Sequence, residues 1–187
     1  MIANEVVGIR AIEKDDLKLL QRWRNNENLR RYFREYREFS LSQKEKWYDS
    51  MINDDRFEMF MIYDNFVESK DPVGVAGFTY IDWLNKHCDL HFYIGQDAQW
   101  IDEKYAPRAL ELMLKRGFHI MNMNKIWAEI YEIDNKKLEF FKKAGFAIDA
   151  TLRQHYYYNG KYYNSHILSL LRGDYEKSIG NSCTPRR

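Results

Sequence analysis

The sequence predicts an α/β (α+β) fold in which helices flank a mixed, mostly antiparallel central sheet. Three strand-like stretches, residues 57–63, 73–81 and 88–95, follow one another across short polar segments, which is typical of an antiparallel meander. A fourth strand-like stretch, residues 125–132, comes after a helix that begins near residues 104–107. This strand–helix–strand order favours a parallel crossover in the second half of the chain.

The N-terminal end supplies one strand and one helix before the meander. Residues 6–12 are apolar and read as a strand. Residues 13–16, three of which are acidic, supply a cap for the following helix, which carries Leu17, Leu20 and Trp23 at helical spacing. We expect these three side chains to form one buried face.

A polar, arginine-rich segment and a second helix come next. Residues 24–37 hold five arginines, and Ser42 then precedes a helix over residues 43–51. Trp47 and Met51 are expected to share its buried face.

The C-terminal half ends in a helix, a hairpin and a tail. Residues 135–143 form a short helix closed by glycine at position 145. Asn159-Gly160, with tyrosines on both sides, predicts a tight hairpin because both turn positions need positive φ. Cross-strand pairing explains these tyrosines without invoking stacking on nucleic-acid bases. From residue 176 the chain turns polar and predicts a loose tail, residues 176–187.

Composition narrows the class of protein. The 187 residues carry 29 basic and 28 acidic side chains, so nothing in the overall charge announces a nucleic-acid partner. Two cysteines, Cys88 and Cys183, offer neither a disulfide framework nor metal-ligand spacing. The first residues lack the pattern of a signal peptide, and no apolar run approaches the roughly 20 residues that cross a bilayer. We expect a cytoplasmic protein without a membrane or metal partner.

At this point six segments in a fixed order resemble the GNAT superfamily of acyl-CoA-dependent N-acetyltransferases. The similarity is to the branch with ribosomal-protein alanine, spermidine and amino-sugar-nucleotide acetyltransferases. The segments are residues 23–25 (WRN), 72–77 (PVGVAG), 92–95 (FYIG), 105–110 (YAPRAL), 141–146 (FKKAGF) and 152–162 (LRQHYYYNGKY). The resemblance implies a single N-acetyltransferase domain over residues 1–175, with a V-shaped splay in the sheet that holds acetyl-CoA.

Two departures from the family pattern concern the cofactor. The family loop has a glycine where this chain has Lys104, followed here by Tyr105 and Ala106. Lys104 can offer an ammonium to the diphosphate or simply face solvent, whereas Asp102 fits a helix cap better than a cofactor contact. The family's proton-donating tyrosine is replaced by Phe141, which has no proton to give and reads as a core aromatic.

The resemblance also implies where the chemistry occurs. Backbone groups around Phe92, Tyr93 and Ile94 would stabilise the thioester oxyanion and hold the pantetheine arm. Asp134 stands where the family has an asparagine that contacts cofactor or substrate, although helix capping is an equally simple role for it.

Acetyl transfer to an amine needs a base, because a protonated amine has no lone pair. Asp89 is the first choice, with a structural, paired carboxylate as the alternative. His91, Glu129 and Glu132 are the other candidates for the base. Tyr131 can replace the missing tyrosine as proton donor.

The acceptor is expected to bind the variable N-terminal part. Arg24, Asn25 and Arg31 are the predicted substrate contacts, since guanidinium groups suit phosphate or carboxylate. A solvated helix surface is the alternative for this arginine-rich segment.

We therefore expect direct transfer from acetyl-CoA to a primary amine in a ternary complex. The predicted partner is a small-molecule amine, an amino sugar or its nucleotide first and a protein N-terminus second. A fold retained as a binding module without activity is the competing hypothesis, and a homodimer fits the C-terminal strands.

Overall fold

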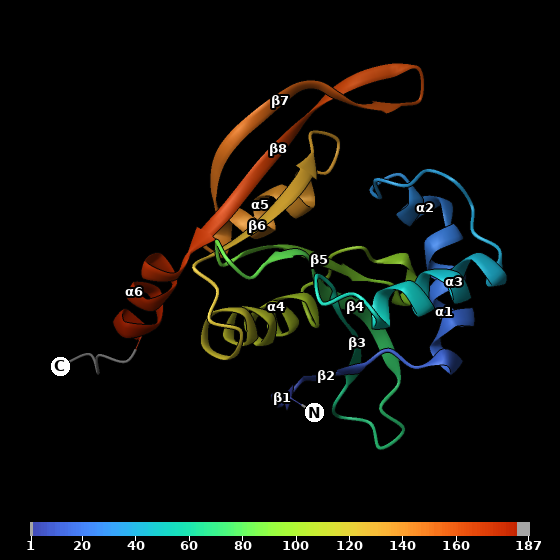
Figure 1. Ribbon diagram of the computed structural model, residues 1–187, viewed down its shortest axis with the longest axis horizontal. Coiled ribbons are helices and arrows are strands. Elements are labelled where there is room, and N and C mark those ends of the chain that lie inside the picture. The colour runs from blue at the N-terminus through green and yellow to red at the C-terminus, as the bar shows by residue number, and fades with distance from the viewer. Residues whose placement is uncertain (1, 183–187) are drawn as a thin grey trace. The chain divides into compact units, whose positions relative to one another are not determined.

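The computed structural model describes residues 2–182 (Figure 1). Contacts divide this part of the chain into two compact units. The first unit holds residues 2–81 and 90–115, and the second holds residues 82–89 and 116–182. One domain over residues 1–175 stays a prediction.

The strands join into one sheet within the described residues, in the order β1-β2-β3-β4-β5-β6-β8-β7. Their bounds are β1 (Ile2–Ala3), β2 (Val7–Ala11), β3 (Glu58–Asp64), β4 (Pro72–Asp82), β5 (His87–Ile94), β6 (Lys125–Tyr131), β7 (Ala147–Tyr158) and β8 (Lys161–Leu171). The pairs β1–β2, β2–β3, β3–β4, β6–β8 and β7–β8 are antiparallel, and β5–β6 is parallel. The predicted mixed, mostly antiparallel sheet is thereby confirmed.

The helices of the first unit cover its strands. They are η1 (Lys14–Asp16), α1 (Leu17–Asn25), α2 (Glu27–Arg30), α3 (Leu41–Ile52), η2 (Gln96–Ala98) and α4 (Ala106–Lys115). Leu17, Leu20 and Trp23 are buried on α1, as their spacing predicts. Helices α1 and α3 lie side by side (Figure 1).

Helix α3 starts two residues earlier than the sequence suggested. Ser40, rather than Ser42, is the N-cap, because its hydroxyl accepts from the Gln43 amide while the Gln43 side chain accepts from the Ser40 amide. The buried face carries Lys44, Tyr48 and Met51. The prediction for Met51 is confirmed, and a lysine shares its face.

The second unit contains the parallel pairing of β5 with β6. Its further helices are η3 (Arg116–Ile120), α5 (Asn135–Lys143) and α6 (Arg172–Ser182). The register between β5 and β6 runs over three pairs, from His87↔Lys125 to Asp89↔Trp127. Strand β6 pairs with β8 along its whole length. The splay expected around Phe92 to Ile94 stays a prediction.

The predicted hairpin is present, but the polar stretch from residue 176 is largely helical. Asn159 and Gly160 have φ of 52° and 82°, as a turn with two positive φ values requires. Helix α6 extends to Ser182 because it is docked: the Tyr175 ring stacks on Phe118 at 4.8 Å between centroids. Cys183 and the rest of the expected tail lie outside the described residues.

The helices are short. The longest in residues 2–182, α3, has 12 residues and therefore spans about 18 Å, against a hydrocarbon core of about 30 Å. None of the helices in this range is long and apolar enough to cross a membrane.

Candidate active site

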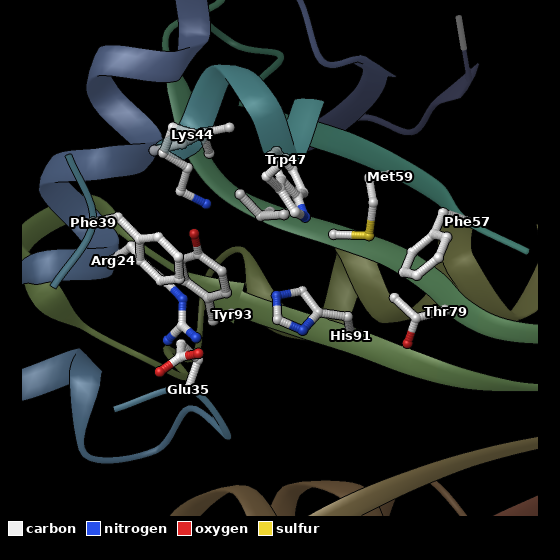
Figure 2. Close-up of a pocket in the computed structure, with 12 residues that line it drawn as sticks. Arg24, Glu35, Phe39, Lys44, Trp47, Phe57, Met59, Thr79, His91 and Tyr93 are labelled. Carbon is white, nitrogen blue, oxygen red and sulfur yellow. The ribbon is translucent and has the colours of Figure 1, made fainter. Parts of the chain in front are cut away.

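A pocket of about 270 Å³ opens in the first unit, between its strands and helices α1 and α3 (Figure 2). The connection from α2 to α3 closes one side of it. The lining residues are Leu20, Arg24, Glu35, Phe39, Lys44, Trp47, Phe57, Met59, Val75, Thr79, His91 and Tyr93. Its size suits a small molecule, and its walls are mainly aromatic and apolar.

The segment that closes the pocket is held by α1. The Asn25 side chain donates to the Phe39 carbonyl (2.9 Å) and accepts from the Phe39 amide (2.8 Å), and Gln21 donates to the same carbonyl (2.8 Å). Both ends of the Asn25 amide are therefore engaged in positioning Phe39 at the pocket wall. A substrate contact for Asn25 stays a prediction.

Lys44 brings a buried positive charge into this pocket. The residue is 8% exposed, and its ammonium lies 4.3 Å from the Trp47 ring and 5.3 Å from the Phe39 ring. Among the described residues, no carboxylate pairs with this ammonium and no acceptor forms a hydrogen bond with it. Burial, and after it the charge of Arg24, lower the pKa of Lys44 to about 8.

The carboxylate of the pocket is already engaged. Glu35 accepts from the Arg37 guanidinium at 2.7 and 2.9 Å and from the Arg37 amide. These hydrogen bonds lower the pKa of Glu35 to about 2, and the charge of Arg24 acts in the same direction. Arg24 itself stacks over the Phe33 ring at 3.7 Å. The lining carries two cations against one compensated acid.

Tyr93 and His91 form the wall contributed by β5. Tyr93 is buried, packed against Trp100 (5.8 Å between centroids) and against the edge of Phe33 (5.0 Å). Burial raises the pKa of its hydroxyl, which therefore stays protonated at neutral pH. His91 lies edge-on to Tyr93 at 5.6 Å. The two rings shape the pocket floor.

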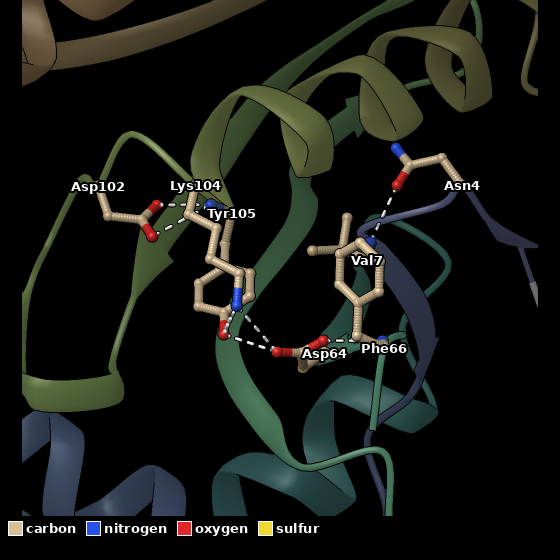
Figure 3. Close-up of polar contacts among 7 residues, drawn as sticks. All are labelled: Asn4, Val7, Asp64, Phe66, Asp102, Lys104 and Tyr105. Atoms are coloured by element: carbon tan, nitrogen blue, oxygen red, sulfur yellow. Dashed lines mark hydrogen bonds and ion pairs between the residues drawn. The ribbon is translucent and has the colours of Figure 1, made fainter. Parts of the chain in front are cut away.

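The start of α4 is capped by Asp102. Its carboxylate accepts from the amides of Tyr105 (3.0 Å) and Ala106 (2.7 Å), as Figure 3 shows for Tyr105. The capping role predicted for Asp102 is confirmed. These are amides at a helix N-terminus of the kind that attract a diphosphate, and in this structure a side chain occupies them.

Lys104 was expected either to contact the diphosphate or to face solvent, and in the structure it is partly exposed and paired with an acid. Its ammonium pairs with Asp64 (3.2 Å) and approaches the Tyr105 hydroxyl (2.6 Å), which also donates to Asp64 (2.7 Å) (Figure 3). Hydrogen bonds to Tyr105 and then Asp64 raise the pKa of Lys104. Burial raises the pKa of Asp64, but the bonds from Tyr105, Phe66 and Lys104 outweigh burial, so its net pKa is lowered.

One of the expected oxyanion donors is occupied. The Ile94 amide donates to the Trp100 carbonyl (2.8 Å), and the Trp100 amide returns a bond to the Ile94 carbonyl (2.9 Å). The Ile94 amide is therefore not the free donor that was expected, and a donor role for Phe92 or Tyr93 stays a prediction. All three side chains are buried.

The predicted catalytic residues Asp89, Glu129 and Tyr131 lie in the second unit. Asp89 is buried in β5, opposite Trp127 of β6. Glu129 accepts a short hydrogen bond from the Ser165 hydroxyl and lies 3.8 Å from His155. Tyr131 is buried and stacked on Tyr156 at 3.7 Å.

Two further residues predicted to contact the cofactor, Asp134 and Phe141, have structural roles in the second unit. Asp134 is buried and caps α5 by accepting from the Lys137 amide at 3.1 Å, so the capping role is confirmed. Phe141 is fully buried and packs edge-on against Phe146 at 4.9 Å. Its reading as a core aromatic is confirmed, and cofactor contacts for both residues stay predictions.

The structure brings only part of the predicted site together. Arg24, His91 and Tyr93 share the pocket, and Asn25 supports its wall. Arg31 lies over the Tyr32 ring at 4.8 Å. Lys44 is not among the residues predicted from the sequence. A lysine four residues before Tyr48 and seven before Met51 interrupts an apolar helix face, and that pattern could have indicated it.

Comparison with known proteins supports the resemblance to the GNAT superfamily. Residues 7–147 match the family model described as acetyltransferase (GNAT) domain. A spermidine N(1)-acetyltransferase of Vibrio cholerae is 23% identical over 172 residues, which cover 92% of this chain and 96% of that protein.

Solved structures share the fold. The crystal structure of spermidine N-acetyltransferase from Vibrio cholerae with CoA and spermine superposes with a TM-score of 0.84 at 23% identity, covering 92% of this chain and 99% of the other. A dodecameric structure of spermidine N-acetyltransferase from Vibrio cholerae gives a TM-score of 0.78 at 21% identity, covering 92% and 97%. At these identities the structural likeness shows the fold alone.

Proposed function

Because the chain belongs to the GNAT acetyltransferase family, we propose that it acetylates a primary amine of a small molecule, an amino sugar or its nucleotide first. It is an N-acetyltransferase, and its acyl donor is acetyl-CoA. The acceptor site that we propose is the pocket lined by Lys44, His91 and Tyr93. A pocket of about 270 Å³ with aromatic walls is the observation that carries this proposal.

The reaction needs a neutral amine and a place for the proton. Asp89 is the proposed base, acting directly or through water, and Glu129 is the second choice. Phe141 has no proton to return to the coenzyme A thiolate, so Tyr131 or solvent does so. We propose direct transfer in a ternary complex: the amine nitrogen bonds to the acetyl carbon, and the carbon–sulfur bond then breaks.

A polyamine is the second candidate acceptor. The relatives named spermidine acetyltransferases favour it, since they match over most of their length. The charges of the pocket argue against it: Lys44 and Arg24 would repel a polycation, and Glu35 is bound to Arg37. A protein N-terminus, the third acceptor, finds little room in a pocket of this size.

A thiol-release assay with acetyl-CoA distinguishes these acceptors. We expect turnover with amino sugars and their phosphates or nucleotides, and weaker turnover with spermidine and peptides. A parallel thermal-shift measurement with acetyl-CoA addresses the alternative of a fold without activity. An unchanged melting temperature at saturating acetyl-CoA, together with no thiol release, would favour a binding module over an enzyme.

Asp89→Asn tests the proposed base. We expect turnover to fall about 100-fold or more, in the range of general-base catalysis, while acetyl-CoA affinity stays within about twofold. The matched control is Glu139→Gln, which removes an exposed carboxylate on α5 that is no candidate for the base. Unchanged turnover in Asp89→Asn would transfer the role of base to Glu129.

Assembly is a separate proposal. A relative is described as dodecameric, and we propose a homodimer through the C-terminal strands of this chain. Light scattering after size exclusion measures the mass, and a mass near 22.7 kDa at working concentration would contradict self-association.

A further inference from the structure

Lys44 is a buried cation whose charge no other described lining residue of the pocket neutralises. The residue is 8% exposed, and its ammonium points into the space between Phe39, Trp47 and Tyr93 (Figure 2). A lysine almost never occupies such a position without an opposite charge. The Trp47 and Phe39 ring faces, 4.3 and 5.3 Å away, offset part of the lost hydration but leave the charge in place.

The neighbouring charges deepen this imbalance. Arg24 lines the same pocket and lowers the pKa of Lys44 by repulsion. Glu35, the one acid among the described lining residues, is bound to Arg37 through two side-chain hydrogen bonds. An anion that entered the pocket would therefore meet a positive field and a donor that has room for it.

We propose that the Lys44 ammonium binds an anionic group, carboxylate or phosphate, on the acceptor. The preferred substrate is then an amine that also carries a negative charge, with the amine oriented away from Lys44. This inference rests on the proposed function, because it names the substrate class for the same pocket. It makes Lys44 a specificity-determining residue and assigns it no part in proton transfer.

Matched acceptor pairs test this selectivity. Glucosamine and glucosamine 6-phosphate present the same amine with and without a phosphate, and propylamine and γ-aminobutyrate do so for a carboxylate. We expect kcat/KM to be higher for the charged member of at least one pair. The pair that discriminates identifies whether phosphate or carboxylate is recognised, and equal values within both pairs overturn the proposal.

Substitution locates the effect. Lys44→Met should lower kcat/KM for the anionic acceptor about 10- to 100-fold more than for the neutral acceptor, mostly through KM, as loss of a charge-assisted hydrogen bond does. Lys44→Arg should restore part of the selectivity. Lys46→Met, on the exposed side of the same helix, is the control and should change neither. Equal losses for both acceptors would mean that Lys44 is only structural.

A titration read by NMR separates this proposal from transferase activity. The ε-carbon of Lys44 should titrate near pH 8, and saturating glucosamine 6-phosphate or γ-aminobutyrate should move that midpoint upward. The other titratable or charged lining groups are Arg24, Glu35, His91 and Tyr93, and the lysine ε-carbon signal is distinct from all four. No upward movement with either anion contradicts the anion site. Movement without any thiol release keeps it and counts against the proposed reaction.

Discussion

Two lysines, Lys44 in the pocket and Lys104 in the segment before α4, have opposite surroundings. Lys44 is almost fully buried, and the described residues offer it aromatic rings and a second cation. Lys104 is more than half exposed, yet Asp64 and Tyr105 meet its charge directly. The pKa of Lys44 is lowered to about 8, whereas the pKa of Lys104 is raised.

The Lys44 ammonium is therefore available to bind an anionic ligand, whereas the Lys104 ammonium is already paired within the fold. A buried ammonium without a carboxylate lowers the stability of the free protein and gains from a bound anion. An exposed ammonium held by Asp64 gains less from a diphosphate, since it must first leave its partner. The residue first singled out for anion binding, Lys104, is therefore the less prepared of the two.

The largest expected effect is on stability, through Lys44→Met. The pKa of Lys44 falls on folding from 10.5, the ordinary value for a lysine in water, to about 8, and each pKa unit corresponds to about 1.4 kcal/mol. The wild type therefore loses up to about 3 kcal/mol at pH 7, and the variant should recover much of it. Urea unfolding measures this gain, with Lys46→Met as the control.

The lowered pKa of Lys44 also predicts how the stability of the wild type changes with pH. Between about pH 8 and 10.5 the unfolded chain binds a proton at Lys44 that the folded chain does not, so wild-type stability should rise with pH there. The variant should lack this rise, and the two curves should approach each other above pH 10. A variant no more stable than the wild type at pH 7 would show that Lys44 is better compensated than its surroundings indicate.

Asp64→Asn tests how much the pairing around Lys104 contributes to stability. The carboxylate accepts from Tyr105, Lys104 and the Phe66 amide, and loss of its charge should lower the free energy of unfolding by about 1–2 kcal/mol at pH 7. Because the pKa of Asp64 is lowered on folding, its contribution is present above pH 3.8 and lost as pH falls through the folded value. Wild type and variant should converge at acid pH, once the pH is below the lowered folded pKa of Asp64.

Asp71→Asn, at an exposed position nearby, controls for a general loss of negative charge. Acetyl-CoA affinity is the second measurement on both variants. Release of Lys104 from Asp64 should tighten acetyl-CoA binding about two- to fivefold if the diphosphate lies at the start of α4. Weaker binding in Asp64→Asn would mean that the pair supports the cofactor site as it stands.

The smallest expected effect concerns Asp102→Asn. An asparagine can still cap α4, so the free energy of unfolding should stay within about 0.5 kcal/mol. Removal of a negative charge beside the diphosphate should tighten acetyl-CoA binding about twofold to fivefold, measured by calorimetry. Glu103→Gln removes a neighbouring charge that caps nothing and should do less. Equal effects of the two variants would place the diphosphate away from these capped amides.

Local physical chemistry explains which elements the sequence predicted well. The Leu17, Leu20 and Trp23 spacing, the meander strands and the Asn159-Gly160 turn depend on residues close in the chain, and each is present in the structure. Capping by Asp102 and Asp134 is equally local, because each carboxylate bonds amides three or four residues ahead. Helix α6 escaped prediction since a distant stacking partner, Phe118, docks its polar sequence.

By itself the sequence determined the family, the strand order of the meander and the absence of a tyrosine hydroxyl at Phe141. Only the tertiary structure decided which charges are satisfied. Asp64 reaches Lys104 across 40 positions, and Lys44 meets Trp47 and Phe39 in a wall that Asn25 holds in place. Electrostatic energies depend on distance in space and on burial, and the order of residues along the chain specifies neither directly.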